Sequence, residues 1–276
     1  LAISEPLAQR LTSLFPDEAR HALGQLSGEL HASTQSILLE NTQVLRNAAL
    51  VRAREVLDSP SRQGVWVQSL LQGGRLNGDG NAASASHKLS GILVGADHDF
   101  EQGTSAGLLL SSGQTRVKTA GGDRATLDGY QFGLHAGHAW DAFGLYGGLA
   151  YGHNRIQTKR HINIAGIDEN LSANYRSRTQ QVFVEGNYRL SQGAWDWQPF
   201  VQLASVRSQT DGFSERGAKS ALSGRAASSA VNLTTGGLRF KVDLHRTSAG
   251  PSWLSLNGSA AYTRASGDLS PTTDVA

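Results

Sequence analysis

From Gly64 onward the chain alternates apolar residues with polar or small ones over long stretches, and this period of two limits its possible folds more than any other feature. Successive side chains of a β-strand point to opposite faces, so these stretches predict strands that each carry one apolar face. Clear examples are residues 130–140, 182–190, 238–244 and 254–262. We count about nine such segments, many of them near or above the roughly 9 to 11 residues that a tilted strand needs to cross a bilayer.

The connections between these segments alternate in length along the chain. Long connections are predicted at residues 76–84, 119–125, 159–170 and 209–226. Short ones are predicted at residues 101–103, 141–142, 191–193 and 246–251. Outer-membrane barrels place short turns on the periplasmic side and long loops outside, whereas a soluble sandwich has no reason to keep this order. We therefore expect an all-β fold, an antiparallel transmembrane β-barrel.

Aromatic residues gather within a few positions of the predicted tight turns. Amphipathic rings are favoured at the boundary between lipid headgroups and hydrocarbon. We therefore expect a girdle of membrane-interface aromatics made by Phe100, Trp140, Phe143, Tyr188, Trp195, Trp197, Phe200 and Trp253.

The segment before Pro60 has a different pattern, with apolar residues at helical spacing between residues 19 and 57. Gly24 and Gly28 predict a division into two helices, and the residue before Pro60 disfavours further helix. No stretch approaches the roughly 18 to 20 consecutive apolar residues of a membrane-spanning helix. We expect residues 1–60 to form a helical linker and residues 61–276 to form the barrel.

Motifs for catalysis and metal binding are sparse. The chain has no cysteine, no H-E-x-x-H and no G-x-x-x-x-G-K-[ST] sequence. His135 and His138 are three apart on a predicted strand and point to opposite faces, which disfavours a shared metal. Residues 77–81 lack the downstream glutamate of a calcium loop. The net charge is only +2, and the sequence has no run of basic residues that would indicate nucleic-acid binding. We expect no catalytic residues, no metal site and no cofactor, and therefore not an enzyme.

Four short motifs, in this order, resemble those of one known family. Residues 26–33 are similar to a helical motif that precedes its barrel, and residues 95–97 resemble the end of its second strand. Residues 198–201 and 212–217 are similar to its later strand and loop signatures. The family is the translocator β-domain of autotransporters, the type V secretion proteins, and the resemblance covers most of residues 20–270.

This resemblance implies a barrel in the outer membrane of a Gram-negative bacterium that lets an N-terminal passenger reach the cell surface. Its expected partners are outer-membrane lipid, its own passenger, the barrel-assembly machinery and periplasmic chaperones. The helix before Pro60 would remain in the lumen as a plug, where its charged residues face a polar interior. These are Arg46, Arg52, Arg54 and Glu55. On the lumen-facing side of the strands we expect them to meet Asp97, Glu185 and Asp243.

Other interpretations remain open at this point. An outer-membrane enzyme or porin would share the strand pattern, and a soluble secreted β-domain would turn the charged helix face toward solvent. Family members resemble each other in having about twelve strands and a terminal aromatic residue, whereas this chain ends at Ala276 after about nine. We therefore expect about three further C-terminal strands beyond residue 276, because open sheet edges in lipid leave backbone groups unpaired.

Overall fold

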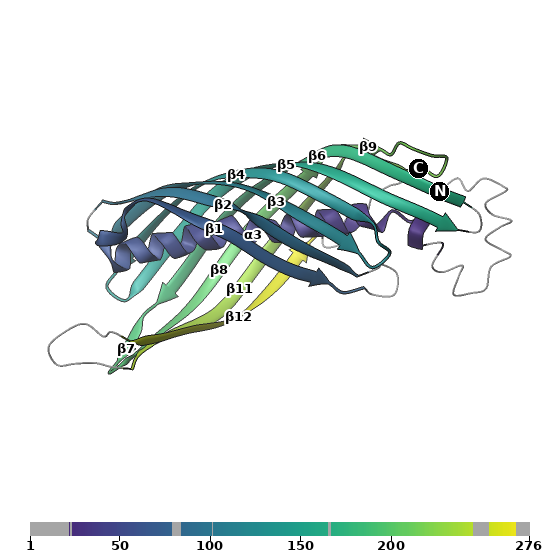
Figure 1. The fold of residues 1–276 in the computed structure, drawn as a ribbon. Helices are drawn as coiled ribbons and strands as arrows, with labels where there is room; N and C mark the ends of the chain where they lie inside the picture. Colours follow the sequence, from purple (N-terminus) through teal and green to yellow (C-terminus); the bar gives the residue numbers. More distant parts are fainter. Residues whose placement is uncertain are drawn as a thin grey trace.

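A computed structural model describes residues 22, 24–78, 84–100, 102–164, 167–244 and 254–268. It shows one antiparallel sheet curled around a long helix (Figure 1). The long strands, in chain order, are β1 (Gly64–Leu76), β2 (Ala85–Asp99), β3 (Thr104–Thr119), β4 (Arg124–Trp140), β5 (Phe143–Ile164), β6 (Ile167–Tyr188), β8 (Trp195–Thr210), β11 (Ala227–Asp243) and β12 (Ser255–Gly267). Each pairs with the next in this order. The fold class expected from the alternation is confirmed.

Three short strands complete the described sheets. β7 (Leu190–Gln192) pairs with β8 beside the turn at residues 193–194. β9 (Phe213–Ser214) and β10 (Ser223–Gly224) pair with each other in the connection between β8 and β11. Among the described residues, the edge strands β1 and β12 each pair on one side only.

The helix α3 (Glu29–Asp58) begins where Gly28 adopts a left-handed backbone with φ of 72°. An L-residue with a side chain is disfavoured there, so this glycine separates α3 from the helical residues before it. Ser59 is extended, a 3₁₀ turn η1 (Pro60–Arg62) follows, and β1 starts at Gly64. None of the helices described is both long and apolar enough to cross a membrane.

The two faces of the sheet differ in what they contact. On β6, every second residue from Leu171 to Glu185 is buried on the concave side, and the residues between them are exposed. The exposed set includes large apolar side chains around the whole sheet, for example Leu149 at 52%, Val182 at 59% and Leu203 at 50% exposure. Because none of the described residues covers this convex apolar face, it is the face that lipid would contact.

The concave face packs against α3. Towards the start of the helix, Leu30, Ile37 and Leu38 lie in a cluster with residues of β3, β4, β5 and β6. Towards its end, Leu45, Ala49 and Ala53 lie in a second cluster with residues of β1, β2, β3, β5, β6 and β8. A Cβ atom built on Gly133 would come within 2.6 Å of a Leu45 methyl carbon. The glycine therefore allows the helix to lie close to β4.

One predicted connection differs from the structure. Residues 159–170 were expected to be a long loop, but β5 and β6 continue through them as a hairpin to Ile164 and Ile167. Their buried side chains, such as Ile162 and Leu171, still alternate, whereas the exposed ones, such as His161 and Asn170, are polar. The strands extend beyond the apolar band, so the side chains on their outer face are polar there and the apolar residues of the alternation are missing.

Neighbouring residues of β8 allow a direct test of the two faces. Leu203 is on the convex face and Gln202 is 8% exposed on the concave face, opposite Glu185 of β6. We expect Leu203→Arg to lower the unfolding free energy by about 2–4 kcal/mol, as an arginine facing lipid near the midplane does. We expect Gln202→Arg to lower it by less than Leu203→Arg does, because the Gln202 side chain lines the space beside α3 and does not face lipid.

The measurement is denaturant unfolding of the protein in lipid vesicles, with the wild type in parallel. Equal losses for the two variants would contradict the assignment of faces.

Candidate functional site

Near the end of α3, the helix is tied to the sheet by a buried carboxylate on β2. Asp97 is 5% exposed and lies 2.7 Å from a terminal guanidinium nitrogen of Arg52. Trp66 of β1 donates its indole N–H to the same carboxylate at 2.6 Å, and His135 of β4 lies 3.0 Å from its other oxygen. The carboxylate therefore joins α3 to three strands, and its charge is matched by Arg52.

A second carboxylate, Glu185 of β6, is held by two arginines. Arg54 of α3 donates to one oxygen at 2.6 Å, and Arg239 of β11 donates to both oxygens at 2.9 and 2.8 Å. The Arg239 guanidinium also lies 3.7 Å above the ring of Phe200. Sequence reasoning selected Arg54 and Glu185 but missed Arg239, although its position on the lumen-facing side of β11 could have indicated it.

The remaining charged residues selected from the sequence have other partners. Arg46 is 4% exposed and donates to the amide oxygen of Gln181 at 2.9 Å. Within the residues that the structure describes, its partner is therefore neutral and is not the expected carboxylate. Glu55 pairs with Arg52 and with Arg62, on the helix side. Asp243 lies 3.4 Å from Lys241 of its own strand and makes no ion pair with α3 among the described residues. It sits at the last position of β11, past Arg239, which takes the contact with Glu185 instead.

Near the start of α3, a further buried network was not expected. Glu215, in the connection between β9 and β10, lies 3.0 Å from His31 of α3 and accepts a hydrogen bond from Arg160 of β5 at 2.7 Å. His31 is 3.0 Å from the hydroxyl of Tyr175 and stacks on Phe213 at 3.9 Å. The sequence indicated this network only through the family resemblance at residues 26–33 and 212–217. That resemblance includes His31 and Glu215 but does not predict that they contact each other.

Opposing effects act on the carboxyl group of Glu215. Burial removes water from it and by itself raises its pKa, while hydrogen bonds from His31 and Arg160 and the charge of Arg160 lower it. The favourable contacts dominate, so the pKa of Glu215 lies below its ordinary value. The group is therefore held as a carboxylate that pairs with Arg160.

Polar side chains of the sheet also bind the backbone of α3. Gln181 donates to the carbonyl of Thr42 at 3.0 Å, and Ser105 donates to the carbonyl of Ala53 at 3.1 Å. Hydrogen bonds from the sheet to the helix backbone therefore hold α3 in place together with the apolar packing.

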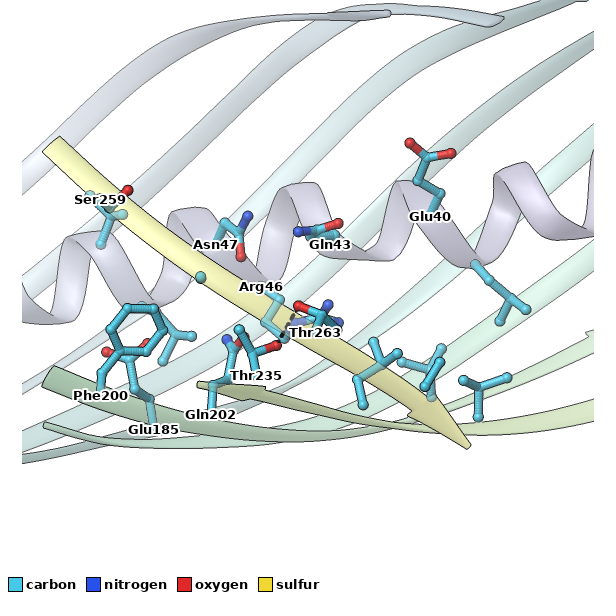
Figure 2. Close-up of a pocket in the computed structure, with 18 of the residues that line it drawn as sticks. Glu40, Gln43, Arg46, Asn47, Glu185, Phe200, Gln202, Thr235, Ser259 and Thr263 are labelled. Atoms are coloured by element: carbon cyan, nitrogen blue, oxygen red, sulfur yellow. Dashed lines mark hydrogen bonds between the residues drawn. The ribbon is translucent and has the colours of Figure 1, made fainter. Parts of the chain in front are cut away.

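A cavity of about 630 Å³ lies between α3 and strands β8, β11 and β12. Figure 2 shows Gln43, Arg46 and Asn47 on the helix and Gln202 and Thr235 on the strands. The helix therefore packs on one side of the sheet's interior and leaves, on the other, a space lined by both polar and apolar side chains. In a closed barrel this space would hold water.

The expected aromatic girdle is mostly on the convex face. Exposed rings at the tight turns are Phe100 at 58%, Trp140 at 51%, Phe143 at 43%, Tyr188 at 49% and Trp195 at 43%. Trp197 stacks on Trp195 at 5.4 Å. The assignment of Phe200 was wrong: it is 9% exposed and faces inward beneath Arg239, because even-numbered residues of this part of β8 point to the lumen. Trp253 lies outside the described residues.

The histidine and serine side chains that could suggest a catalytic or metal site are hydrogen-bonded to other parts of the fold. His135 faces inward to Asp97, while His138 lies 2.7 Å from the hydroxyl of Thr104. The described residues hold no cluster of three or more histidine and acidic side chains suited to a metal. Residues 103–107 read G-x-S-x-G, a spacing that sequence reasoning overlooked. Their Ser105 is 1% exposed, bonds a helix carbonyl and is followed by a strand, whereas a nucleophile elbow exposes its serine before a helix.

Comparisons with known proteins agree with this architecture. Two extracellular serine proteases of Serratia marcescens are 28% and 30% identical to this chain, over 94% and 80% of its length. The chain spans only 25% and 22% of their lengths. The translocator domain of autotransporter NalP from Neisseria meningitidis has a TM-score of 0.66 at 20% identity, covering 86% of this chain and 81% of that one.

The β-domain of the Bordetella autotransporter BrkA has a TM-score of 0.58 at 20% identity, over 74% of this chain and 80% of that one. The family described as autotransporter β-domain matches residues 65–276. This match covers all the strands of the curled sheet, and the resemblance seen in the sequence is confirmed. The chain therefore belongs to the autotransporter β-domain family and is a translocator domain.

Proposed function

We propose that this domain sits in the outer membrane of a Gram-negative bacterium, that it mediates delivery of an N-terminal passenger to the cell surface, and that α3 remains inside it as a plug. The observation that carries the plug is the pairing of Arg52 with Asp97 and of Arg54 with Glu185. A helix with these charges is stable inside a membrane only where the surrounding wall supplies opposite charge. Membership of the autotransporter family supports the location.

The plug is held at both ends. Near the start of α3, His31 meets Glu215, and towards its end Arg52 and Arg54 meet Asp97 and Glu185. Between these ends, apolar side chains of the helix pack on β2 to β6. A helix fixed in this way cannot slide along the lumen without uncovering buried charges, which is expensive.

The passenger is a separate part of the proposal. The Serratia relatives are extracellular serine proteases, and the region they share with this chain is about a quarter of their length. We place enzymatic activity in the passenger and none in this domain, whose Ser105 is buried. The barrel-assembly machinery and periplasmic chaperones are the partners that a barrel of this kind requires for insertion.

Removal of the plug tests the proposal directly. We expect deletion of residues 22–58 from the full-length autotransporter to raise single-channel conductance in planar bilayers, because removal of the helix widens the space beside β8, β11 and β12. Arg62→Ala is the control, since this side chain is 57% exposed and, in the described part of the chain, forms an ion pair with Glu55 alone. Conductance that is unchanged after the deletion would remove the plug from the proposal.

The Arg52–Asp97 pair is suited to a double-mutant cycle. We expect Arg52→Ala to lower the unfolding free energy by about 3–5 kcal/mol, because it leaves the buried Asp97 without its arginine partner. We expect Asp97→Ala to lower it by less, because Arg52 keeps its ion pair with Glu55. The double variant should lose less than the sum by at least about 1 kcal/mol. Denaturant unfolding in vesicles measures all four proteins, and strict additivity would show that the two groups do not interact.

The Glu215 network predicts a dependence on pH. Because the folded pKa of Glu215 is depressed, its contribution to stability is present above the ordinary glutamate pKa of about 4.3 and is lost as pH falls through the folded value. We expect the protein to be more stable than its Glu215→Gln variant at pH 7, with the difference shrinking below about pH 4. Thermal unfolding between pH 3 and pH 8 measures it, and a difference that grows towards acid would contradict the sign.

A further inference from the structure

A basic surface lies on the convex side of the sheet, just beyond the apolar band. On each of six adjacent strands the outward side chains change from apolar to polar and then to a cation. On β5, for example, Tyr151 is followed four residues later by Arg155, and on β6 Val182 is followed by Arg178 towards the same end. The first cation on each strand is four to six residues beyond the last apolar side chain: Lys88, Arg116, Arg124, Arg155, Arg178 and Arg207.

This end of the sheet is opposite the aromatic girdle. The tight turns carry Phe100, Trp140 and Phe143, and the cations lie at the other ends of the same strands. In the topology of the family the tight turns are periplasmic, so the basic surface faces the outer leaflet. This placement rests on the proposed outer-membrane location.

Three more cations join the first six, and they lie directly across from them. Lys118 of β3 pairs in register with Arg124, which in turn pairs with Lys159 of β5, giving three cations in one row. Arg155 faces Arg176 of β6 in the same way, and Lys88 faces Arg116. Like charges directly opposite one another destabilise a sheet, so this arrangement is unfavourable unless anions lie between them.

The chain itself supplies few such anions. All nine cations are exposed, and none forms an ion pair with another residue in the described parts of the chain. On the same outward face the strands carry two carboxylates, Asp128 and Asp168. A third, the exposed Asp211, directly follows β8 and lies across from Arg176, whose carbonyl accepts its backbone N–H at 2.9 Å. Asp128 accepts a hydrogen bond from Gln114 at 2.8 Å, and Asp168 lies 3.7 Å from His161. The surface therefore needs anions from outside the protein.

The height of the cations indicates the kind of anion. A strand rises about 3.4 Å per residue and tilts by about 40° in a barrel, so four to six residues correspond to roughly 10 to 16 Å along the membrane normal. The headgroup layer of an ordinary bilayer adds only about 5 to 8 Å beyond the hydrocarbon. Long lysine and arginine side chains can extend back toward the bilayer over part of this distance. A headgroup of phosphorylated sugars extends farther from the hydrocarbon than an ordinary headgroup and covers the remaining distance.

We propose that this basic surface binds the phosphate groups of a phosphorylated glycolipid in the outer leaflet. Arg155, Arg176 and Arg178 form its centre. They lie beside the stacked rings of Tyr130 and His153, whose centroids are 5.4 Å apart, at the upper edge of the apolar band. Arginine binds phosphate oxygens through paired N–H groups, and adjacent arginines can hold one phosphate between them.

The test uses the full-length autotransporter in zwitterionic detergent and a fluorescent lipid A that carries two phosphates. One variant combines Arg155→Gln, Arg176→Gln and Arg178→Gln. The matched control removes the same charge from the connection between β8 and β11, with Arg216→Gln, Lys219→Gln and Arg225→Gln. Heat-modifiable migration on gels and surface delivery of the passenger are measured for each protein, so that failure of the proposed function is seen separately.

We expect the strand variant to bind the lipid about a hundredfold more weakly at low salt, and the control to differ from wild type by less than about threefold. The single variant Arg178→Gln should weaken binding by about fivefold and serves if the triple variant does not fold. A dephosphorylated lipid A should bind weakly to the wild type, and inorganic pyrophosphate at equal concentration should not displace the lipid. Equal weakening by both triple variants, equal binding of the dephosphorylated lipid, or displacement by pyrophosphate would each overturn the proposal.

Discussion

The interior of this domain depends on charge pairing between a helix and a wall that encloses it. Arg52 and Arg54 could not be buried against a sheet whose outer face is apolar unless the inner face carried carboxylates at matching heights. Asp97 and Glu185 meet that requirement from β2 and β6, and neither is more than 5% exposed. Because each carboxylate also binds side chains from other strands, these pairs join the helix to the sheet and the strands to one another.

The same constraint explains why the helix packs unevenly. Apolar residues of α3 and glycines such as Gly133 bring it close to β4, while its polar residues face β11 and β12 across a wide cavity. A helix packed tightly on all sides would bury Gln43 and Asn47 without partners. The cavity leaves these groups unburied, and the ion pairs of Arg52 and Arg54 fix the position of the helix along the sheet.

On the convex face of the sheet, the side chains form three layers of different chemistry. Aromatic rings occupy the end with tight turns, apolar side chains cover the middle, and cations such as Arg155 and Arg178 occupy the far end. Inside, Arg160 and Glu215 close the same far end around His31. The two faces of each strand therefore serve different environments within a few ångströms, which a two-residue period makes possible.

The sequence by itself determined the strands, their antiparallel order, the helix before Pro60 and the family, because a period of two and the alternation of turn lengths are local properties that need no contact across the chain. It also indicated Asp97 and Glu185, since strand parity decides which face a side chain takes. Only the tertiary structure decided which charges meet. The register places Arg239 rather than Asp243 beside Glu185, turns Phe200 inward, gives Arg46 the neutral partner Gln181, and brings His31 to Glu215 across 184 residues. Such contacts depend on how the sheet curls and how far the helix reaches, and neither quantity is encoded in a short stretch of sequence.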